Sequence, residues 1–234
     1  MTPTFRDKLR NASFYIAIIS IVTSALLINF LHEKIRIHMS KKHSGTIIIL
    51  NGVSSAGKSS IIKAFQKQQK DLWISAGIDQ LYVGVIPPHF LDGSPEHEHV
   101  MTVRSSEDTE HNKVVTAVFG PSGEKIIKGM HQALAAYAHA GNNVIADYIM
   151  YDPAWMKDLK KALHDVNVIF VGVTAPLDVI EKREKDRGTS PQGHARSHYH
   201  SVHDNVAYDL IIDTSTMTPE QAAEKIGVIL KNKN

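Results

Sequence analysis

The segment that decides the fold runs from Thr46 to Ser59 and reads TIIILNGVSSAGKS. Its first part, Thr46–Leu50, is an uninterrupted apolar and β-branched run, which is typical of a buried strand in a parallel sheet. Its second part, Gly52–Ser59, fits the pattern G-x-x-x-x-G-K-[ST] at every fixed position. Apolar residues then recur among lysines over Ser59–Gln69, which indicates a half-buried helix. A strand, a glycine loop and a helix in this order predict a phosphate-binding loop.

The residue types of this loop follow from what a phosphate requires. Glycines let the backbone turn so that successive N–H groups face one anion, and the following helix directs its positive end at the same phosphates. Lys58 is expected to reach the β- and γ-phosphates of ATP, and the Ser59 hydroxyl is expected to bind Mg²⁺. The residues expected to contact the nucleotide here are Gly52, Val53, Ser54, Ser55, Ala56, Gly57, Lys58, Ser59 and Ser60.

Strands and helices alternate along the rest of the chain, which predicts a doubly wound parallel sheet with helices on both faces. The polar segment Gly84–Asn112 interrupts this order and is predicted to be a long functional or mobile excursion. The domain is expected to span residues 39–234, after an N-terminal apolar segment over residues 1–38. The further strands are predicted at Leu72–Ile78, Val144–Ala146, Val166–Val173 and Leu210–Ile212, and the further helices at Pro121–His139, Asp152–Leu163, Pro176–Arg187 and from Thr218 onward.

Two carboxylates follow predicted strands, at the edge where ligands bind in open α/β sheets. Asp79 stands 21 residues beyond Lys58 and is a candidate to accept or position the proton of an acceptor hydroxyl. The alternative role for Asp79 is a helix N-cap. Asp147 is a candidate Mg²⁺ ligand, directly or through water, and its alternative is an ordinary polar strand end.

The segment Glu181–Gly188, EKREKDRG, carries seven charged side chains before its glycine. A charge run of this kind is usually a solvated helix face. Phosphoryl transfer, however, benefits from guanidinium groups that neutralise charge on the transferring group. Arg183 and Arg187 are four residues apart, so a helix places both on one face. Both interpretations stay open: a solvated face, or an arginine lid.

Composition narrows the class of function. The 234 residues include 26 basic and 24 acidic side chains, a balance that does not favour a nucleic-acid binder. There is no cysteine, which excludes disulfides, thiolate metal sites and cysteine nucleophiles. Many of the 14 histidines gather around His97 and within His194–His203. Their spacing is compatible with metal binding, but we expect solvated loop histidines instead.

The N-terminal segment is apolar from Phe14 to Leu31, eighteen residues without a charged side chain. That length is near the lower limit for a membrane-spanning helix, about 17–25 residues. Basic residues flank both ends, so the positive-inside rule does not orient the segment. We expect a membrane anchor with the domain on the cytoplasmic side. The alternatives are a signal peptide cleaved near Thr23–Ala25, or a dispensable extension before Met39 of a soluble cytoplasmic protein.

Five segments together resemble one family, in order and spacing over most of the chain from Thr46. They are IIILNGVSSAGKSSI, SAGID, AGNNVIAD, VIEKREKDRG and YDLIIDTS, and they are similar to the chloramphenicol phosphotransferase-like P-loop kinases. The resemblance implies a five-stranded parallel sheet with a helical lid, and transfer of the ATP γ-phosphate to a small-molecule hydroxyl. It also implies that Asp79 is the catalytic carboxylate, that Arg183 and Arg187 belong to the lid, and that the loop Thr214–Thr216 lies near the adenine, with Thr214 as a nucleotide contact.

The chain departs from that family in three places. Thr189 stands where members often carry an aspartate after Arg-Gly, and Tyr148 stands where a second acid commonly follows Asp147. The segment Gly84–Asn112, expected to form the acceptor pocket, is long and unlike the antibiotic-binding version. The resemblance therefore supports an ATP- and Mg²⁺-dependent phosphotransferase with an alcohol acceptor, and leaves the acceptor open.

Two other functions remain as alternatives. A zeta-toxin-like nucleotide-sugar kinase would share the loop and the carboxylate, but it needs a wide basic pocket. The excursion Gly84–Asn112 offers only Arg104, with Lys113 at its edge. A membrane-tethered nucleotide-binding module without catalysis is the second alternative. The joint presence of a candidate base and a candidate lid favours the enzyme.

Overall fold

The computed structural model describes residues 22–34 and 44–233, and the chain divides into two compact units, Met1–His43 and Ser44–Asn234. In the first unit, residues 22–34 form a helix with exposed apolar side chains. Among the described residues, none of the helices combines the length and apolar character that a membrane crossing requires. The predicted spanning helix over residues 14–31 is therefore not supported. Residues 14–21 lie outside the described residues.

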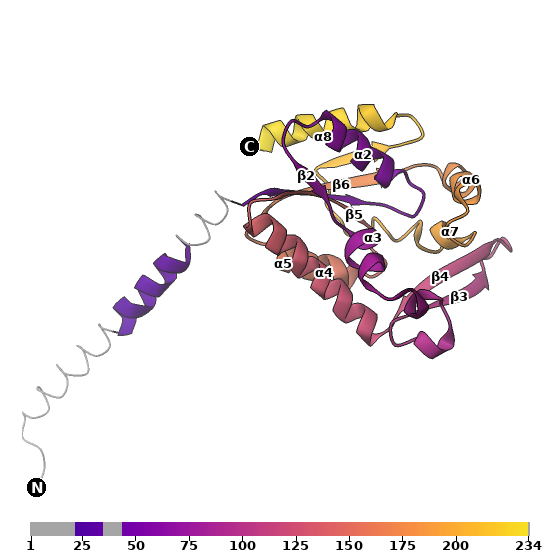
Figure 1. Ribbon diagram of the computed structural model, residues 1–234, viewed down its shortest axis with the longest axis horizontal. Coiled ribbons are helices and arrows are strands. Elements are labelled where there is room, and N and C mark those ends of the chain that lie inside the picture. Colours follow the sequence, from indigo (N-terminus) through magenta and orange to yellow (C-terminus); the bar gives the residue numbers. More distant parts are fainter. Residues whose placement is uncertain (1–21, 35–43, 234) are drawn as a thin grey trace, which may run out of the picture. The chain divides into compact units, whose positions relative to one another are not determined.

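The second unit is built on a five-stranded parallel sheet, as predicted (Figure 1). Its strand order is β2-β5-β1-β6-β7, with β1 at the centre between β5 and β6. All six residues of β1 are buried, which explains its continuous apolar sequence. The strands are β1 (Thr46–Asn51), β2 (Trp73–Ser75), β5 (Asn143–Tyr148), β6 (Asn167–Thr174) and β7 (Leu210–Asp213).

Helices cover both faces of this sheet. Figure 1 shows α2 and α8 together on one face, and α4 and α5 on the other. The helices α3, α6 and α7 lie toward the ends of the strands. The helices are α2 (Lys58–Gln68), α3 (Ile78–Leu81), α4 (Pro121–His139), α5 (Pro153–Ala162), α6 (Leu177–Arg187), α7 (His194–His198) and α8 (Pro219–Lys233).

The helix ends follow local chemistry. Asp152 caps α5, because its carboxylate accepts a hydrogen bond from the N–H of Ala154 at 2.7 Å, and Pro153 begins the helix. Pro121 likewise begins α4. Gly188 ends α6 with φ of +62°, a conformation that costs glycine nothing. These signals are visible in the sequence, and the predicted bounds of α4 match the structure.

The segment predicted as one long excursion, Gly84–Asn112, contains the first strand of a β-hairpin whose second strand follows it directly, and the sequence analysis predicted neither strand. Three short 3-10 turns, Val83–Val85, Pro88–Leu91 and Pro95–His97, lead into β3 (Met101–Glu107), which pairs antiparallel with β4 (Lys113–Phe119). The outer part of β3 is exposed, so it shows no apolar alternation. Asp108 builds the turn by accepting hydrogen bonds from the N–H groups of Glu110 and Asn112.

The second predicted strand, Leu72–Ile78, is shorter than expected. The strand β2 ends at Ser75, and Asp79 lies in the first turn of α3 instead of at a strand end. The chain leaves the sheet at Gly77, where it passes against Asp147. A Cβ on Gly77 would lie 2.3 Å from the Asp147 carbonyl oxygen, so only glycine fits this crossing.

Candidate active site

The loop between β1 and α2 has the backbone of an anion-binding site. Ser55 and Gly57 have positive φ angles of 62° and 98°, on either side of Ala56. Left-handed residues alternating with others in such a loop direct successive N–H groups toward one point. The Ser55 hydroxyl is buried without a hydrogen-bond partner among the described residues. An unpaired donor at this concavity fits the oxygens of a polyphosphate.

Lys58 begins α2 and its side chain folds back over this loop. Its ammonium donates hydrogen bonds to the carbonyl oxygens of Gly52 at 2.7 Å and Val53 at 2.8 Å. Burial lowers the pKa of Lys58 to about 8, and the negative charges of Asp147 and Asp79 oppose that decrease. The ammonium is therefore charged at neutral pH, which places a buried cation beside the loop.

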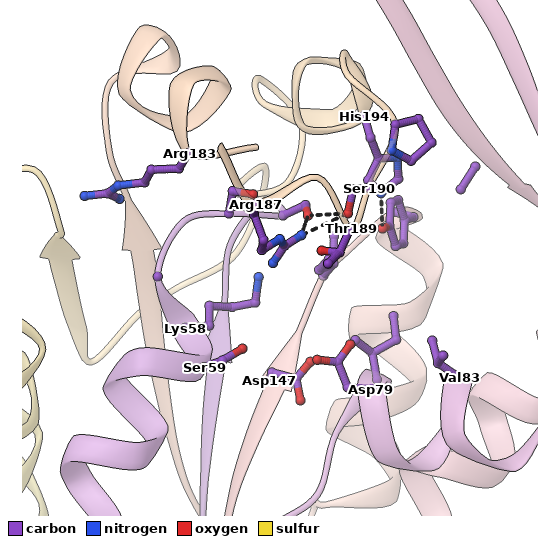
Figure 2. Close-up of a pocket in the computed structure, with 18 of the residues that line it drawn as sticks. Lys58, Ser59, Asp79, Val83, Asp147, Arg183, Arg187, Thr189, Ser190 and His194 are labelled. Carbon is purple, nitrogen blue, oxygen red and sulfur yellow. Dashed lines mark hydrogen bonds between the residues drawn. The ribbon is translucent and has the colours of Figure 1, made fainter. Parts of the chain in front are cut away.

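Asp147 lies near the end of β5, where the sequence predicted a carboxylate, and only 4% of its surface is exposed. Burial raises the pKa of Asp147 to about 6; the charge of Asp79 adds to the increase and Lys58 opposes it. The carboxylates of Asp147 and Asp79 face each other below Lys58 and Ser59 (Figure 2). Two carboxylates and a serine hydroxyl supply oxygen donors of the kind that Mg²⁺ prefers.

Asp79 is exposed and lines the same cavity as Lys58. The alternative of a helix N-cap is wrong, because Gly77 occupies the residue before α3 and Asp79 sits inside the first turn. Its carboxylate is therefore available to the cavity rather than committed to a helix end.

The two arginines of α6 point to different partners. Arg187 donates to the hydroxyls of Ser54 and Ser190, both at 2.9 Å, and so reaches the phosphate loop. Arg183 donates to the hydroxyl and the carbonyl oxygen of Thr214, both at 2.9 Å. Figure 2 shows Arg187 beside Lys58 and Arg183 pointing away from it.

Thr214 closes the loop from the other side. Its hydroxyl lies 2.9 Å from the carbonyl oxygen of Ala56, and a Cβ on Gly57 would contact its side chain at 3.4 Å. The structure thus brings Thr214, which is distant in sequence, against the phosphate loop.

The charge run of α6 also holds a buried residue that the sequence did not single out. Glu184 is 1% exposed and accepts hydrogen bonds from the N–H groups of Gly193 at 2.8 Å and Ala195 at 2.9 Å. These contacts attach α7 to α6. Arg196 of α7 extends the assembly, because it donates to Glu181 of α6 and to Asp108 of the hairpin turn.

A cavity of about 1070 Å³ extends from the phosphate loop to the β3–β4 hairpin. We call its hairpin end the acceptor chamber. The hairpin forms one wall of this chamber with Met101, Val103, Val115, Ala117 and Phe119, and Ile149 and Leu91 extend the apolar surface. Among the described residues that line the cavity, Lys58, Arg183 and Arg187 are the lysines and arginines, and they belong to the phosphate end. Arg104 and Lys113 are exposed and do not line it. The chamber is therefore lined mainly by apolar side chains, and its polar groups are those of Tyr82, Asp92, Tyr151 and His194.

Two histidines of the second group, His194 and His198, are not the solvated loop residues that we expected, whereas His200 is exposed. His194 and His198 lie in α7; His198 is 3% exposed and His194 half-buried. Burial lowers the pKa of His198 to about 2, and burial is also the main cause that lowers the pKa of His194. In residues 22–34 and 44–233, no group of three or more histidine, aspartate or glutamate side chains is arranged to hold a metal ion.

Two residues that line the cavity, Tyr151 and His194, escaped the sequence analysis, as did the buried Glu184 of α6. Glu184 is hidden among charged neighbours. Tyr151 follows β5 by three residues and carries no motif. His194 belongs to a visible histidine group, but only the fold shows that it turns toward the cavity and not toward solvent.

Comparison with known proteins agrees with this geometry. A phosphate loop at the edge of a parallel sheet, with a buried lysine and a helical lid, defines the class of P-loop phosphotransferases. The family of chloramphenicol phosphotransferase-like proteins matches residues 45–231, and the chain belongs to that family. A Mycobacterium tuberculosis protein named "Putative O-phosphotransferase" is 30% identical over 188 residues, which cover 80% of this chain and 83% of that protein. A guanylate kinase of Caldanaerobacter subterraneus is 24% identical over 82% of this chain and 89% of its own length.

Solved structures share the fold at low sequence identity. The Mycobacterium tuberculosis APS kinase, in complex with AMPPNP and APS, covers 80% of this chain and 98% of its own length with a TM-score of 0.53 and 15% identity. The Deinococcus radiodurans tunicamycin resistance protein covers 80% and 95%, with a TM-score of 0.53 and 19% identity. These likenesses support the kinase fold and carry no substrate with them.

Proposed function

We propose that this protein transfers the γ-phosphate of ATP, with Mg²⁺, to a hydroxyl of an uncharged, largely apolar small molecule. The observation that carries the proposal is the apolar chamber that opens beside Asp79 and adjoins the phosphate loop. An anionic acceptor, such as a nucleotide sugar, would need basic side chains in the chamber to replace its hydration. This requirement disfavours the zeta-toxin-like alternative.

Each group of the phosphate end has a distinct task in this proposal. The loop N–H groups of residues 52–60 and Lys58 bind the phosphates, with Arg183 and Thr214 at the nucleotide side. Ser59 and Asp147 hold Mg²⁺, which when bound neutralises charge on the phosphate oxygens. Arg187 stabilises the charge that spreads over the transferring phosphoryl group.

Asp79 acts on the acceptor. It positions the attacking hydroxyl and accepts its proton as the O–P bond forms and the bond to ADP breaks. Its exposed carboxylate meets the chamber on one side and the phosphate loop on the other, which suits a group that joins two substrates.

The test is a transfer assay with the full-length chain, radiolabelled ATP and Mg²⁺. The panel contains hydroxylated molecules in three sets: uncharged and apolar, cationic, and anionic with a phosphate or carboxylate. We expect transfer to members of the uncharged set. Transfer confined to anionic acceptors, or ATP binding without transfer to any acceptor, would contradict the proposal.

The Asp79→Asn variant separates catalysis from binding in the same assay. Loss of the base should lower the single-turnover transfer rate by about 10²–10⁴-fold, the usual scale for a positioned general base. ATP affinity, measured by calorimetry, should change little, because the nucleotide is held by other residues. Unchanged transfer would show that Asp79 is not the base.

A further inference from the structure

A chain of hydrogen bonds lies in the wall of the acceptor chamber and joins β4, α7 and the segment after β5. The carbonyl oxygen of Val115, in β4, lies 3.2 Å from Nδ1 of His194 in α7. Nε2 of the same ring lies 2.9 Å from the hydroxyl of Tyr151, which follows β5. All three residues line the cavity, and Figure 2 shows His194 on the lid, above the level of Asp79.

The chemistry of these groups fixes the direction of each hydrogen bond. A carbonyl oxygen can only accept, so Nδ1 of His194 carries the proton and donates it to Val115. In the neutral ring Nε2 then holds a lone pair, and the Tyr151 hydroxyl must donate to it. The only proton of the Tyr151 hydroxyl is used in the hydrogen bond to His194. Toward the chamber, the hydroxyl oxygen can therefore act only as a hydrogen-bond acceptor.

The charges around the chain keep this arrangement neutral. For His194, burial lowers the pKa, and the positive charges of Arg187 and Lys58 act in the same direction against the Val115 hydrogen bond and Glu184. For Tyr151, burial raises the pKa well above its usual range, and the charge of Asp79 adds to it, followed by Tyr82 and Glu184. Neither an imidazolium nor a phenolate forms at neutral pH.

We propose that Tyr151 Oη is a specificity-determining hydrogen-bond acceptor, which binds a second donor group of the molecule that is phosphorylated. His194 is the positioning residue that fixes the direction of the phenol. The proposal rests on the phosphotransferase function above and narrows its substrate class. The acceptor is an apolar molecule with one hydroxyl for transfer and a second hydroxyl or N–H for Tyr151.

The burial of Tyr151 makes this discrimination strong. A substrate without the second donor still displaces water from the Tyr151 oxygen but makes no hydrogen bond to it. The lone pair of that oxygen then stays desolvated and unpaired, which weakens binding of such a substrate. The apolar wall of Met101, Val103 and Phe119 supplies affinity but does not distinguish a hydroxyl from its methyl ether. Tyr151 is placed to make that distinction.

The test uses the three isomers of benzenedimethanol, each compared with its mono-methyl ether. Each ether keeps one hydroxyl for phosphorylation and lacks the second donor. Two quantities are measured on the full-length chain: kcat/KM for transfer, and probe affinity by calorimetry with Mg²⁺ and a non-hydrolysable ATP analogue. For at least one isomer, we expect the diol to exceed its ether by about tenfold or more in both quantities.

Variants assign that preference to the chain of hydrogen bonds. Tyr151→Phe should reduce the ratio of diol to ether to near one, whereas Tyr137→Phe, which removes an exposed hydroxyl on α4, should keep it. His194→Leu frees the Tyr151 proton, so the ratio should shift toward the ether, which can only accept. His194→Gln offers an oxygen in place of Nε2 and should restore part of the preference for the diol. MgATP affinity and thermal unfolding, measured on every variant, report whether each one is folded.

The outcomes are separable from those of the proposed function. Binding of the probes with the expected ratio but without transfer would contradict the phosphotransferase proposal for these acceptors and support the role of Tyr151. A wild-type ratio near one for all three isomers would overturn the inference, as would a ratio that survives Tyr151→Phe or an absence of probe binding.

Discussion

Asp147 and Lys58 occupy positions where burial opposes the charge that their proposed roles require. The two groups lower this cost for each other, because each shifts the pKa of the other toward the charged form. Active sites commonly hold such groups at the expense of stability. The effect has a pH dependence that can be measured.

The Asp147→Asn variant should be more stable than the wild type at neutral pH. The folded-state pKa of Asp147, about 6, exceeds its ordinary value of 3.8. Between these values the folded state binds more protons than the unfolded state, so stability decreases as pH rises through the window. Asparagine does not ionise, so the variant does not lose this stability. At pH values above that range, its free energy of unfolding should exceed that of the wild type by about 1–2 kcal/mol.

Chemical denaturation at two pH values measures this effect. The gain should be present at about pH 7.5 and absent at about pH 4, where the wild-type carboxyl is largely protonated. Mg²⁺-dependent transfer should fall sharply in the same variant. Equal stability at the higher pH would contradict the assigned burial cost.

At the scale of elements, α6 carries two arginines one helical turn apart whose side chains contact different partners. Arg187 reaches Ser54 of the phosphate loop, and Arg183 reaches Thr214. We expect Arg187→Ala to lower the transfer rate at saturating ATP by about 10²–10³-fold, since it removes charge stabilisation at the phosphoryl group. Arg183→Ala should mainly raise the KM for ATP. Lys185→Ala, on an exposed position of α6, is the matched control; the same kinetic change in both arginine variants would refute separate roles.

The elements that the sequence revealed are those with local signals. The strand β1 begins with four β-branched residues, α5 has an Asp-Pro start, and α4 begins at Pro121, so each is predictable from its own residues. The strand β3 gave no such signal, because five of its seven residues are exposed. The strand β4, KVVTAVF, is mostly half-buried and carries a β-branched run that the sequence analysis did not assign to a strand. Only the fold shows that the apolar side chains of this hairpin line the same cavity as Asp79.

The candidate site divides in the same way. The phosphate loop is marked by the spacing of its motif and Asp147 by the end of a strand, whereas Asp79 was expected at a strand end and lies in the first turn of α3. The Tyr151–His194 contact joins residues 43 positions apart. Glu184 is buried and bonded to Gly193, although a run of charged residues usually forms a solvated helix face. Such contacts depend on the packing of α6 and α7 and leave no trace in local pattern.

At the scale of the whole molecule, the cavity separates its basic side chains from its apolar wall. The net charge of the chain is only +2, but the basic side chains of the cavity gather at the phosphate end. Nucleotide binding and acceptor binding therefore draw on different interactions. The first should depend on ionic strength, and the second on apolar contact.

Nucleotide binding should stabilise the entire second unit. A non-hydrolysable ATP analogue with Mg²⁺, at 100 times its Kd, should add about 2.7 kcal/mol to the free energy of unfolding, because it binds only the folded state. Thermal unfolding with and without the analogue measures this. Lys58→Ala should lose the shift, and Lys63→Ala, an exposed position on the same helix, should keep it. A full shift in Lys58→Ala would contradict the phosphate-binding assignment.

Arg196 joins α6 to the hairpin turn, and Glu184 joins α6 to α7. The lid, which consists of α6 and α7, is therefore hydrogen-bonded to the wall of the acceptor chamber, and we expect the two to move together. A movement of α6 that brings Arg187 onto the phosphates must carry His194 and the hairpin with it. The two substrates should then bind with positive cooperativity, and thermodynamic reciprocity requires the acceptor to tighten ATP by the same factor by which ATP tightens the acceptor. With the proposed transfer, we therefore expect slow hydrolysis of ATP in the absence of the acceptor and faster turnover when the acceptor is added.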